Sequence, residues 1–327
     1  MNLIFLGTPS FALPSLKSLA QSHHKISAVV TQPDKPRGRI GHPLPPPVKE
    51  LAQGLGLRVI QPGNVNEGAF LTELKGLNPD IIVVVAFGQR LSRAFVELPK
   101  ICCINLHASL LPKYRGAAPI NWAIINGETV TGVTVLRVAE KMDSGDILAM
   151  HQNGTWLAQD FADIGPEETA GELEERLAFI GAPLLLKVLE GFEHSNVCFI
   201  PQRHELATQA PKLKREDGLI KWVQPAQRVH NFIRGMNPRP GAYTFLPSGK
   251  RLLVLHSRLV TENVRVKNIQ PLPAKPGTII RLSEEGILVA ANGSAIWITH
   301  LQPEGGKVMT AAEYLRGHPL CVGETFS

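Results

Sequence analysis

The sequence contains few cysteines and no long apolar run. Only four of its 327 residues are cysteines, and Cys102 and Cys103 are adjacent in an apolar stretch, which is not a metal-binding spacing. This arrangement indicates small buried thiols in a reducing compartment. The longest strongly apolar run, residues 81–87, is far shorter than the roughly 20 residues that span a bilayer. We therefore expect a cytoplasmic protein that does not enter a membrane.

Several common cofactor and metal motifs are also absent. The first apolar stretch ends in "GTPSF" (Gly7–Phe11) and not in G-x-G-x-x-G, which disfavours a nicotinamide-dependent oxidoreductase. Neither a C-x-x-C pair nor H-E-x-x-H occurs. The sequence therefore predicts chemistry without a metal.

Positive charge is concentrated in the second half of the chain. Through Glu190 there are 17 Lys and Arg against 18 Asp and Glu, whereas from Gly191 onward there are 17 against 10. The net charge of +6 thus comes entirely from the second half. Such an excess is consistent either with an ordinary solvated surface or with a surface that binds a polyanion such as nucleic acid.

The first half alternates short apolar stretches with segments of helical spacing. Residues 2–7, 25–32, 57–62, 79–87 and 99–107 are predicted strands, and residues 10–22, 45–56 and 67–78 are predicted helices. The run "IIVVVAF" from Ile81 is continuously apolar, as is typical of a strand buried on both faces. This pattern predicts an α/β fold with a parallel sheet and helices on both faces.

Asn105 and His107 lie where one of these strands ends. Ligands of such sheets bind outside the carboxyl ends of the strands. Alternation along a strand places the two side chains on the same side, about 6.6 Å apart at ~3.3 Å per residue. Beyond them, Gly116-Ala117-Ala118 leaves a bare backbone against which a flat ligand could lie. We interpret the pair as part of a functional site.

Asp143 belongs to a later loop, "AEKMDSGDI", between two further predicted strands. An isolated Asp in such a loop usually caps a turn. Next to a catalytic histidine, however, a carboxylate fixes the imidazole tautomer and favours its charged form.

These motifs resemble the formyltransferase family that uses 10-formyltetrahydrofolate. The resemblance is carried by "NLHASLLPKYRGAAPINWAI" and "MDSGDI", and it extends over nearly the whole chain through "GTPSFALPSL", "QPDKPRGRIGHPLPPPVK" and "LQPEGGKVMTAAEYLRG". The last three segments are similar to the branch of the family whose acceptor is the methionine of initiator Met-tRNA. The resemblance therefore implies formyl transfer to that amine, with 10-formyltetrahydrofolate as donor.

The resemblance also implies roles for individual residues. Asn105, His107 and Asp143 would be catalytic, and Ser109, Leu110, Leu111 and Pro112 would line the folate site. Asn105 can donate a hydrogen bond to a tetrahedral oxyanion, a role worth ~10²–10³ in rate. His107 can either stabilise that oxyanion as imidazolium or move protons, worth ~10²–10⁴. The residues leave this choice open.

A proline-rich loop at residues 33–47 carries further basic residues. In the family the corresponding loop contacts the tRNA acceptor end, which implies this role for Arg37 and Arg39. The sequence departs from the family after Arg39, where "IGHP" replaces a more lysine-rich continuation, and His42 is an alternative contact. The other interpretation of the loop is a solvated surface feature.

The second half is predicted to be rich in short strands with one helix at residues 226–236. Predicted strands include residues 218–222, 242–246, 251–260, 277–282, 286–291 and 295–301. The full expectation is a Rossmann-like formyltransferase domain at residues 1–189, a linker at 190–207 and an OB-like β-barrel at 208–327 that binds tRNA. We expect a monomer.

Three other functions remain open from the sequence. A sugar-nucleotide or purine formyltransferase would share Asn105, His107 and Asp143 but would need no basic second half. A formyltetrahydrofolate deformylase would use water as the acceptor. A non-catalytic RNA-binding protein would leave these three residues without a role.

Overall fold

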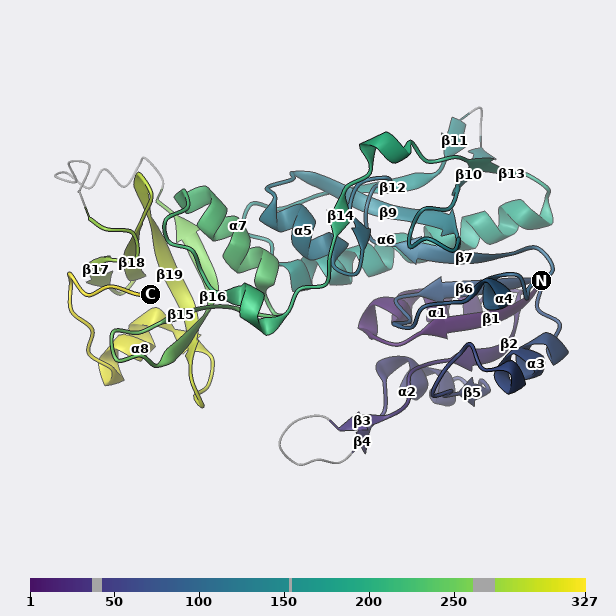
Figure 1. The fold of residues 1–327 in the computed structure, drawn as a ribbon, viewed down its shortest axis with the longest axis horizontal. Helices are drawn as coiled ribbons and strands as arrows, with labels where there is room; N and C mark the ends of the chain where they lie inside the picture. The colour runs from purple at the N-terminus through teal and green to yellow at the C-terminus, as the bar shows by residue number, and fades with distance from the viewer. Residues whose placement is uncertain (37–42, 153–154, 261–273) are drawn as a thin grey trace. The chain divides into compact units, whose positions relative to one another are not determined.

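A computed structural model describes residues 1–36, 43–152, 155–260 and 274–327 (Figure 1). The chain divides into two compact units, and each contains segments from distant parts of the sequence. Unit 1 consists of Met1–Pro119, Val130–Asp163 and Glu174–Pro211. Unit 2 consists of Ile120–Thr129, Ile164–Leu173 and Lys212–Ser327.

Unit 1 contains a large sheet with strand order β11-β10-β9-β7-β6-β1-β2-β5, which can be followed in Figure 1. The strands β1, β2, β5, β6 and β7 are parallel, and β9 joins β7 in the antiparallel direction. The sheet consists of β1 (Asn2–Gly7), β2 (Lys25–Val30), β5 (Val59–Ile60), β6 (Ile81–Val85), β7 (Cys102–His107), β9 (Val130–Arg137), β10 (Ile147–Gln152), β11 (Thr155–Leu157), β12 (Gln159–Asp163) and β13 (Val197–Ile200).

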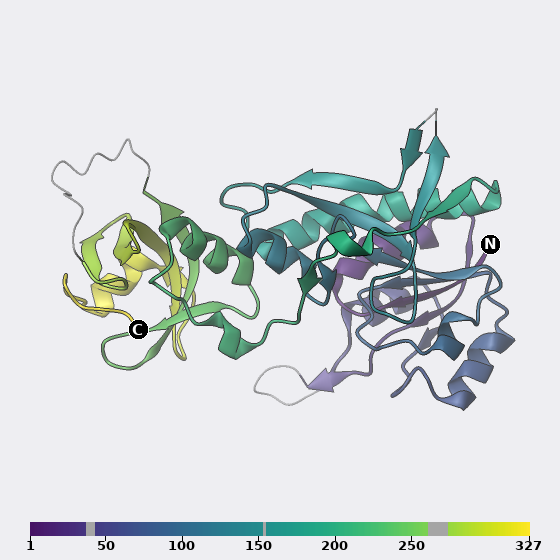
Figure 2. The ribbon, with the colours of Figure 1, turned by 45° about the horizontal axis from the view of Figure 1, so that its top comes forward.

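Helices cover both faces of this sheet, as the sequence predicts. Phe70 of α3 (Gly68–Gly76) and Phe95 of α4 (Arg93–Val96) pack in one apolar cluster with Cys103 of β7. Leu106 points to the opposite face, where it meets Gly181 of the long helix α6 (Ala170–Glu193). Figures 1 and 2 show α6 running alongside β7 and β9. The continuously apolar strand β6 is buried along its whole length, as expected.

The remaining helices begin and end near the prolines and glycines of the sequence. Pro119 starts α5, and Gly127 follows its end with a φ of 79°, as expected for a helix terminus. The other helices are α1 (Leu13–Ala20), α2 (Pro47–Gly54), α5 (Pro119–Ile125), α7 (Ala226–Met236), α8 (Ala311–Gly317) and the short 3₁₀ helices at Ser10–Ala12, His204–Leu206 and Arg215–Gly218.

Unit 2 is built on an antiparallel sheet with strand order β15-β16-β19-β18-β17 and with β20 paired to β19. One face packs on α7, which buries Val229, Ile233 and Met236 at helical spacing. The strands are β15 (Ala242–Phe245), β16 (Arg251–Leu259), β17 (Ile279–Ser283), β18 (Gly286–Ala291), β19 (Ser294–Pro303) and β20 (Met309–Thr310). The antiparallel sheet confirms the strand-rich prediction, whereas its closure into an OB-like barrel stays a prediction.

One predicted strand is wrong. Residues 218–222 contain only an isolated bridge at Leu219, preceded by the 3₁₀ helix that ends at Gly218. The side chain of Asp217 accepts a hydrogen bond from the backbone of Lys214, which closes this turn. The backbone of Gly218 also approaches that of Gly241 so closely that a side chain would not fit. A Cβ at Gly218 would be 2.2 Å from the carbonyl oxygen of Gly241.

The segment expected to be a linker, residues 190–207, contains regular structure. It includes the end of α6, strand β13 and the 3₁₀ helix at His204–Leu206. The expected domain boundaries at residues 189 and 207 stay predictions. In the part of the chain that the structure describes, no helix is both long and apolar enough to cross a membrane.

Candidate active site

Asn105 and His107 lie on β7, between the parallel strand β6 and the antiparallel strand β9. Asn105 is paired with Val84 and Leu136, and His107 is opposite Thr134. His107 is buried, with 6% of its surface exposed, whereas Asn105 is half-buried. The pairing fixes both backbones, and alternation along the strand directs both side chains to one side.

Hydrogen-bond acceptors face both ring nitrogens of His107. Nε2 lies 2.9 Å from the carbonyl oxygen of Tyr114, and Nδ1 lies 3.7 Å from Oδ2 of Asp143. A carbonyl oxygen only accepts, so Nε2 carries the proton in this arrangement. A second proton on Nδ1 would give an imidazolium that faces a carboxylate. The carbonyl group of Tyr114 and the carboxylate of Asp143 therefore orient the His107 ring.

The protein backbone holds Asp143 in place. Its Oδ2 accepts a hydrogen bond of 2.9 Å from the backbone N–H of Gly116. Asp143 itself has a φ of 52°, in the left-handed region that non-glycine residues seldom occupy. Such conformations cost about 1–3 kcal/mol and concentrate at functional sites. The structure thus brings together the three residues that the sequence predicts to be catalytic.

The segment Tyr114–Gly116 is fixed by residues from much later in the chain. Strand β8 (Arg115–Gly116) pairs in parallel with β14 (Gln209–Ala210). Thr208 accepts hydrogen bonds from the backbones of Tyr114 and Arg115, at 2.8 Å to its hydroxyl and 2.9 Å to its carbonyl oxygen. A Cβ on Gly116 would lie 2.5 Å from the carbonyl oxygen of Ala210.

This packing corrects one expectation for Gly116. The sequence suggests a bare backbone against which a ligand could lie, but Ala210 occupies the space next to Gly116. The glycine is needed there for a close approach of the chain to itself, and its φ of 128° is also one that favours glycine.

Gln202 connects the loop of Asp143 to the segment of Gly116. Its Nε2 donates to the carbonyl oxygens of Asp143 at 2.9 Å and Gly145 at 2.6 Å. Its Oε1 accepts from Nε of Arg115 at 3.1 Å and from Nη2 at 2.6 Å. Gln202 is buried, and the four hydrogen bonds use the full capacity of its amide.

The sequence gives no local signal for Gln202, because its partners are about 60 and 90 positions away along the chain. Arg115 is also buried, and its Nη2 lies 2.9 Å from Nδ1 of His204. Burial lowers the pKa of Arg115, and the nearby Asp143 carboxylate acts in the opposite direction. This buried polar network therefore joins the loop of Asp143 to Arg115, which lies between the two residues whose backbones contact His107 and Asp143.

The side chain of Asn105 differs from its neighbours because, within the described residues, it makes no hydrogen bond to the protein. Its amide can therefore donate to a bound molecule without breaking an internal contact.

The residues predicted to line the folate site, Ser109–Pro112, are held tightly by Thr134 and Gln159. The hydroxyl of Thr134 donates to the carbonyl oxygen of Ser109 at 2.6 Å and accepts from the N–H of Leu111 at 3.2 Å. Gln159 donates to the carbonyl oxygen of Leu111 at 2.9 Å. Ser109 and Leu111 are buried, whereas Leu110 and Pro112 are half-buried. Only the latter two side chains present surface to a ligand.

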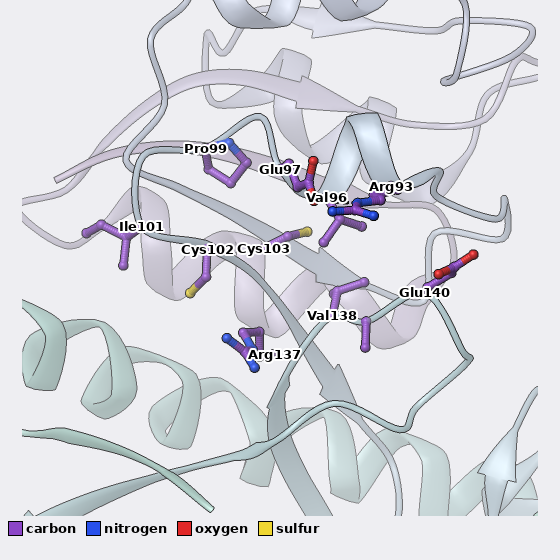
Figure 3. A pocket seen from close by; sticks show the side chains of 11 residues that line it. Arg93, Val96, Glu97, Pro99, Ile101, Cys102, Cys103, Arg137, Val138 and Glu140 are labelled. Atoms are coloured by element: carbon purple, nitrogen blue, oxygen red, sulfur yellow. Dashed lines mark hydrogen bonds and ion pairs between the residues drawn. The ribbon is translucent and has the colours of Figure 1, made fainter. Parts of the chain in front are cut away.

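A hollow of about 470 Å³ begins at the other end of β7. Figure 3 shows side chains of α4 on one side and the segment Arg137–Glu140 on the other. Cys102 and Cys103, which begin β7, also line it. Cys102 is five residues from His107, or about 16 Å along a strand. The hollow therefore does not contain the three predicted catalytic residues, although it shares with them β7 and the segment that leads to Asp143.

The thiols in this hollow are not activated. Burial raises the pKa of Cys102 to about 11 and shifts that of Cys103 in the same direction. Both thiols are thus protonated at neutral pH, which argues against nucleophilic catalysis there.

Arg37 and Arg39, predicted to contact tRNA, and the alternative His42 lie outside the described residues. The structure does show the base of their loop, where β3 (Lys35–Pro36) pairs with β4 (Pro43–Leu44). Lys49 forms an ion pair of 2.7 Å with Asp34 next to this base.

One group among the described residues has donor atoms close enough to share a metal ion. It consists of His23, His24 and Glu193, whose donor atoms lie within 4.8 Å of one another. The histidines precede β2, whose start pairs with the start of β1. The group therefore lies at the amino-terminal ends of the parallel strands, whereas His107 lies at a carboxyl-terminal end. The expectation of metal-free chemistry stays a prediction.

Comparison with known proteins gives matches along almost the whole chain. The profile of the family described as "Formyl transferase" matches residues 1–189, and that described as "Formyl transferase, C-terminal domain" matches residues 212–319. A methionyl-tRNA formyltransferase of Moorella thermoacetica is 46% identical over 324 residues, covering 99% of this chain and 98% of the relative. One from Syntrophus aciditrophicus is 42% identical over 323 residues, with the same coverage.

Solved structures with a similar fold are more distant in sequence. HypX from Aquifex aeolicus, in complex with tetrahydrofolic acid, has a TM-score of 0.63 at 19% identity and covers 99% of this chain and 50% of that one. An N-formyltransferase from Helicobacter canadensis, in complex with folinic acid and dTDP-3-aminofucose, has a TM-score of 0.64 at 19% identity, covering 90% and 98%. At this identity the likeness concerns the fold alone.

Proposed function

Because this chain belongs to the formyl transferase family, we propose that it transfers the formyl group of 10-formyltetrahydrofolate to the free amino group of methionine on initiator Met-tRNA. The observation that carries the proposal is the match to enzymes named methionyl-tRNA formyltransferase, which is 42–46% identical over nearly the full length of both chains. A sugar N-formyltransferase activity has weaker support, because that likeness is one of fold at 19% identity.

The reaction joins the methionine nitrogen to the formyl carbon. Attack of the amine gives a tetrahedral oxyanion, the amine loses a proton, and the bond to N10 then breaks as N10 takes up a proton. We propose that Asn105 donates a hydrogen bond to the oxyanion. Its side-chain amide has no competing partner among the described residues, which supports this role. Such a donor is worth ~10²–10³ in rate.

We propose that His107 acts mainly through its positive charge. Its two ring nitrogens face a carbonyl and a carboxylate oxygen, so a doubly protonated ring would satisfy both. Asp143, which the N–H of Gly116 anchors, would stabilise that charge. A proton shuttle would instead have to release one of these contacts during each turnover.

For the donor, we propose contacts on both sides of the candidate active site. Leu110 and Pro112 would lie near the formyl group, since they are the more exposed members of the segment Ser109–Pro112. The hollow of Figure 3 would hold a more distant part of the extended folate molecule, because its wall at Arg137–Glu140 leads directly to Asp143.

For the acceptor, we propose that the basic second half binds the tRNA and that Arg37 and Arg39 guide its acceptor end. From Gly191 onward, Lys and Arg exceed Asp and Glu by 17 to 10. Guanidinium groups can fork onto phosphates and stack on unpaired bases. The proposal includes an OB-like tRNA-binding domain at 208–327, a monomeric enzyme and a cytoplasmic location.

A single comparison of acceptors tests the function. The purified chain is incubated with 10-formyltetrahydrofolate and either initiator Met-tRNA, an amino-sugar nucleotide or water alone. Formylmethionyl-tRNA is expected from the first mixture, at a rate far above formate release in the third. A formylated amino sugar, or formate release that Met-tRNA does not outcompete, would overturn the proposal.

A further inference from the structure

Unit 2 contains a hollow of about 320 Å³ at the start of β16. Two arginines, Arg215 and Arg251, line it. Gln302 and Glu304, near the end of β19, form part of its wall. These residues belong to the same compact unit and take no part in the site around His107.

Arg251 is held in a fixed orientation but lacks a hydrogen-bond acceptor. Its guanidinium lies over the ring of Tyr243, with 3.8 Å between its central carbon and the ring centroid. Its Nε is buried and has no hydrogen-bond partner. Buried N–H groups are paired in the great majority of cases, so an orphan of this kind calls for an absent acceptor.

Neither guanidinium of the hollow is neutralised by the protein. Within the described residues, no carboxylate lies within 4.0 Å of Arg215 or Arg251, although Glu304 lines the same hollow. The buried Arg234 of the same unit behaves differently, because Asn231, Gly165 and Glu168 accept hydrogen bonds from it. The hollow therefore combines two unpaired positive charges with an unsatisfied donor.

We propose that this hollow binds a backbone phosphate of the RNA substrate. Arginine presents a planar fork of N–H donors that matches phosphate oxygens, and stacking on Tyr243 fixes the plane of that fork for Arg251. The more exposed Arg215 would close on the same phosphate from the other side. The proposal rests on the proposed function, since it assumes that tRNA is the acceptor.

The charge around the hollow favours a nucleic-acid strand over a free anion. Glu304 repels any anion, and an isolated phosphate has no second contact to offset that cost. An RNA strand also meets the exposed Lys214, Arg239 and Lys250, each a sequence neighbour of a residue that lines the hollow. Most of the affinity of such contacts comes from the release of counterions.

Salt dependence of tRNA binding tests the proposal on the full chain. The variants are Arg215→Gln and Arg251→Gln, and the matched control is Arg258→Gln. Arg258 lies on the same strand as Arg251 but is paired with Glu285 at 3.0 Å. Each hollow variant should reduce the slope of log K against log salt by ~0.7–0.9. The control should leave the slope unchanged, despite the same loss of one charge.

Formylation kinetics separate a binding role from a structural one. Both hollow variants should raise KM for Met-tRNA several-fold while kcat and KM for the folate donor stay as in the wild type. Arg251→Lys should retain the salt slope, because it keeps the charge, but should raise KM, because it loses the fork. If Arg251→Gln does not fold by circular dichroism, the exposed Arg215→Gln decides the question.

Three outcomes would overturn the proposal. The first is an equal slope of log K against log salt for all three glutamine variants, which would show that the two arginines of the hollow contribute no more than any other positive charge. The second is unchanged tRNA binding in both hollow variants of an enzyme that still formylates Met-tRNA, which leaves the proposed function intact. The third is calorimetric binding of inorganic phosphate to the wild type, lost in Arg251→Gln, without any change in tRNA binding. A wild-type chain that binds tRNA through these arginines but does not formylate Met-tRNA would support the site and refute the proposed function.

Discussion

At the scale of single residues, Asn105 and His107 differ in how much of their hydrogen-bonding capacity the protein itself uses. His107 has an acceptor at each ring nitrogen, whereas the Asn105 amide has no partner among the described residues. The histidine is thus held in one orientation, and the asparagine is available to a ligand. This difference separates a residue that the protein itself orients from one whose side chain is available to a bound molecule.

Replacement of Asn105 should therefore affect turnover more than donor binding. We expect Asn105→Ala to lower kcat by ~10²–10³-fold, because the oxyanion loses a hydrogen bond that forms only as charge develops. Single-turnover formylation measures the rate, and fluorescence titration measures folate affinity. Asn105→Asp is the matched variant, since it keeps the shape but cannot donate. Turnover close to wild type in Asn105→Asp would rule out the donor role.

His24 provides a pH-dependent prediction about stability. Burial lowers its pKa from the ordinary value of 6.5, and the attraction of Glu193 opposes this only in part. The unfolded chain therefore binds the proton at a higher pH than the folded chain does. Between the lower pKa of His24 in the folded chain and the ordinary value of 6.5, the free energy of unfolding must therefore rise with pH. It falls as the pH drops below about 6.5.

Urea unfolding between pH 7.5 and pH 5 measures this effect. The free energy of unfolding should decline less steeply for His24→Gln than for the wild type, because glutamine does not titrate. His194→Gln is the control, since His194 is an exposed histidine. If the free energy of unfolding fell equally with pH in the wild type and in His24→Gln, His24 would not be the source of the pH dependence.

At the scale of elements, residues 202–210 complete a site whose other members come from β7, β8 and the loop of Asp143. Gln202 bonds to the backbone on both sides of Ser144 and to the side chain of Arg115. Without it, two carbonyl groups and a buried guanidinium lose partners, at about 1–3 kcal/mol for each unsatisfied group. We therefore regard Gln202 as a positioning residue.

Gln202→Ala should lower kcat by at least ~10-fold with little change in either KM, because small displacements of catalytic groups are costly. Gln159→Ala is the control. Gln159 bonds to Leu111 and Thr134 and makes no hydrogen bond to the Asp143 loop, so its loss should act on KM for the folate donor, through the proposed folate segment, more than on kcat. Thermal melting of both variants checks for unfolding. A larger loss of kcat in Gln159→Ala than in Gln202→Ala would refute the positioning role.

Local patterns in the sequence predict the central elements well. The apolar run of β6 and the alternation at Asn105 and His107 are local features, and the structure confirms the parallel sheet that they predict. The role of Gln202, by contrast, could not be predicted from the sequence, because its hydrogen-bond partners are far away along the chain. The incorrect strand at 218–222 has a similar cause, because the close approach of Gly218 to Gly241 depends on tertiary packing.

At the scale of the whole molecule, the two compact units do not correspond to two continuous stretches of sequence. Unit 1 requires Glu174–Pro211, which includes β13, Gln202 and β14. A cut at the proposed boundary after Leu189 would remove these parts of the candidate active site while leaving Asn105, His107 and Asp143 in the chain.

A chain that ends at Pro211 should therefore melt at a higher temperature than one that ends at Leu189. Removal of residues 190–211 deletes two strands that pair with β10 and β8, along with the partners of Arg115. Differential scanning calorimetry of the two truncated chains measures the difference. Equal melting temperatures would show that the segment contributes nothing to unit 1.

The pairing of β8 with β14 also has a consequence for the order in which the protein matures on the ribosome. Asp143 depends on Gly116, and Gly116 is fixed by Ala210, which is made 94 residues later. At a synthesis rate of about 5–20 residues per second, that separation corresponds to roughly 5–20 s. During this interval the nascent chain already carries Asn105 and His107, but the strand that fixes Gly116 does not yet exist. Catalytic competence is therefore a late event in the synthesis of a fold in which the parallel strands of the large sheet are all made before Gly116.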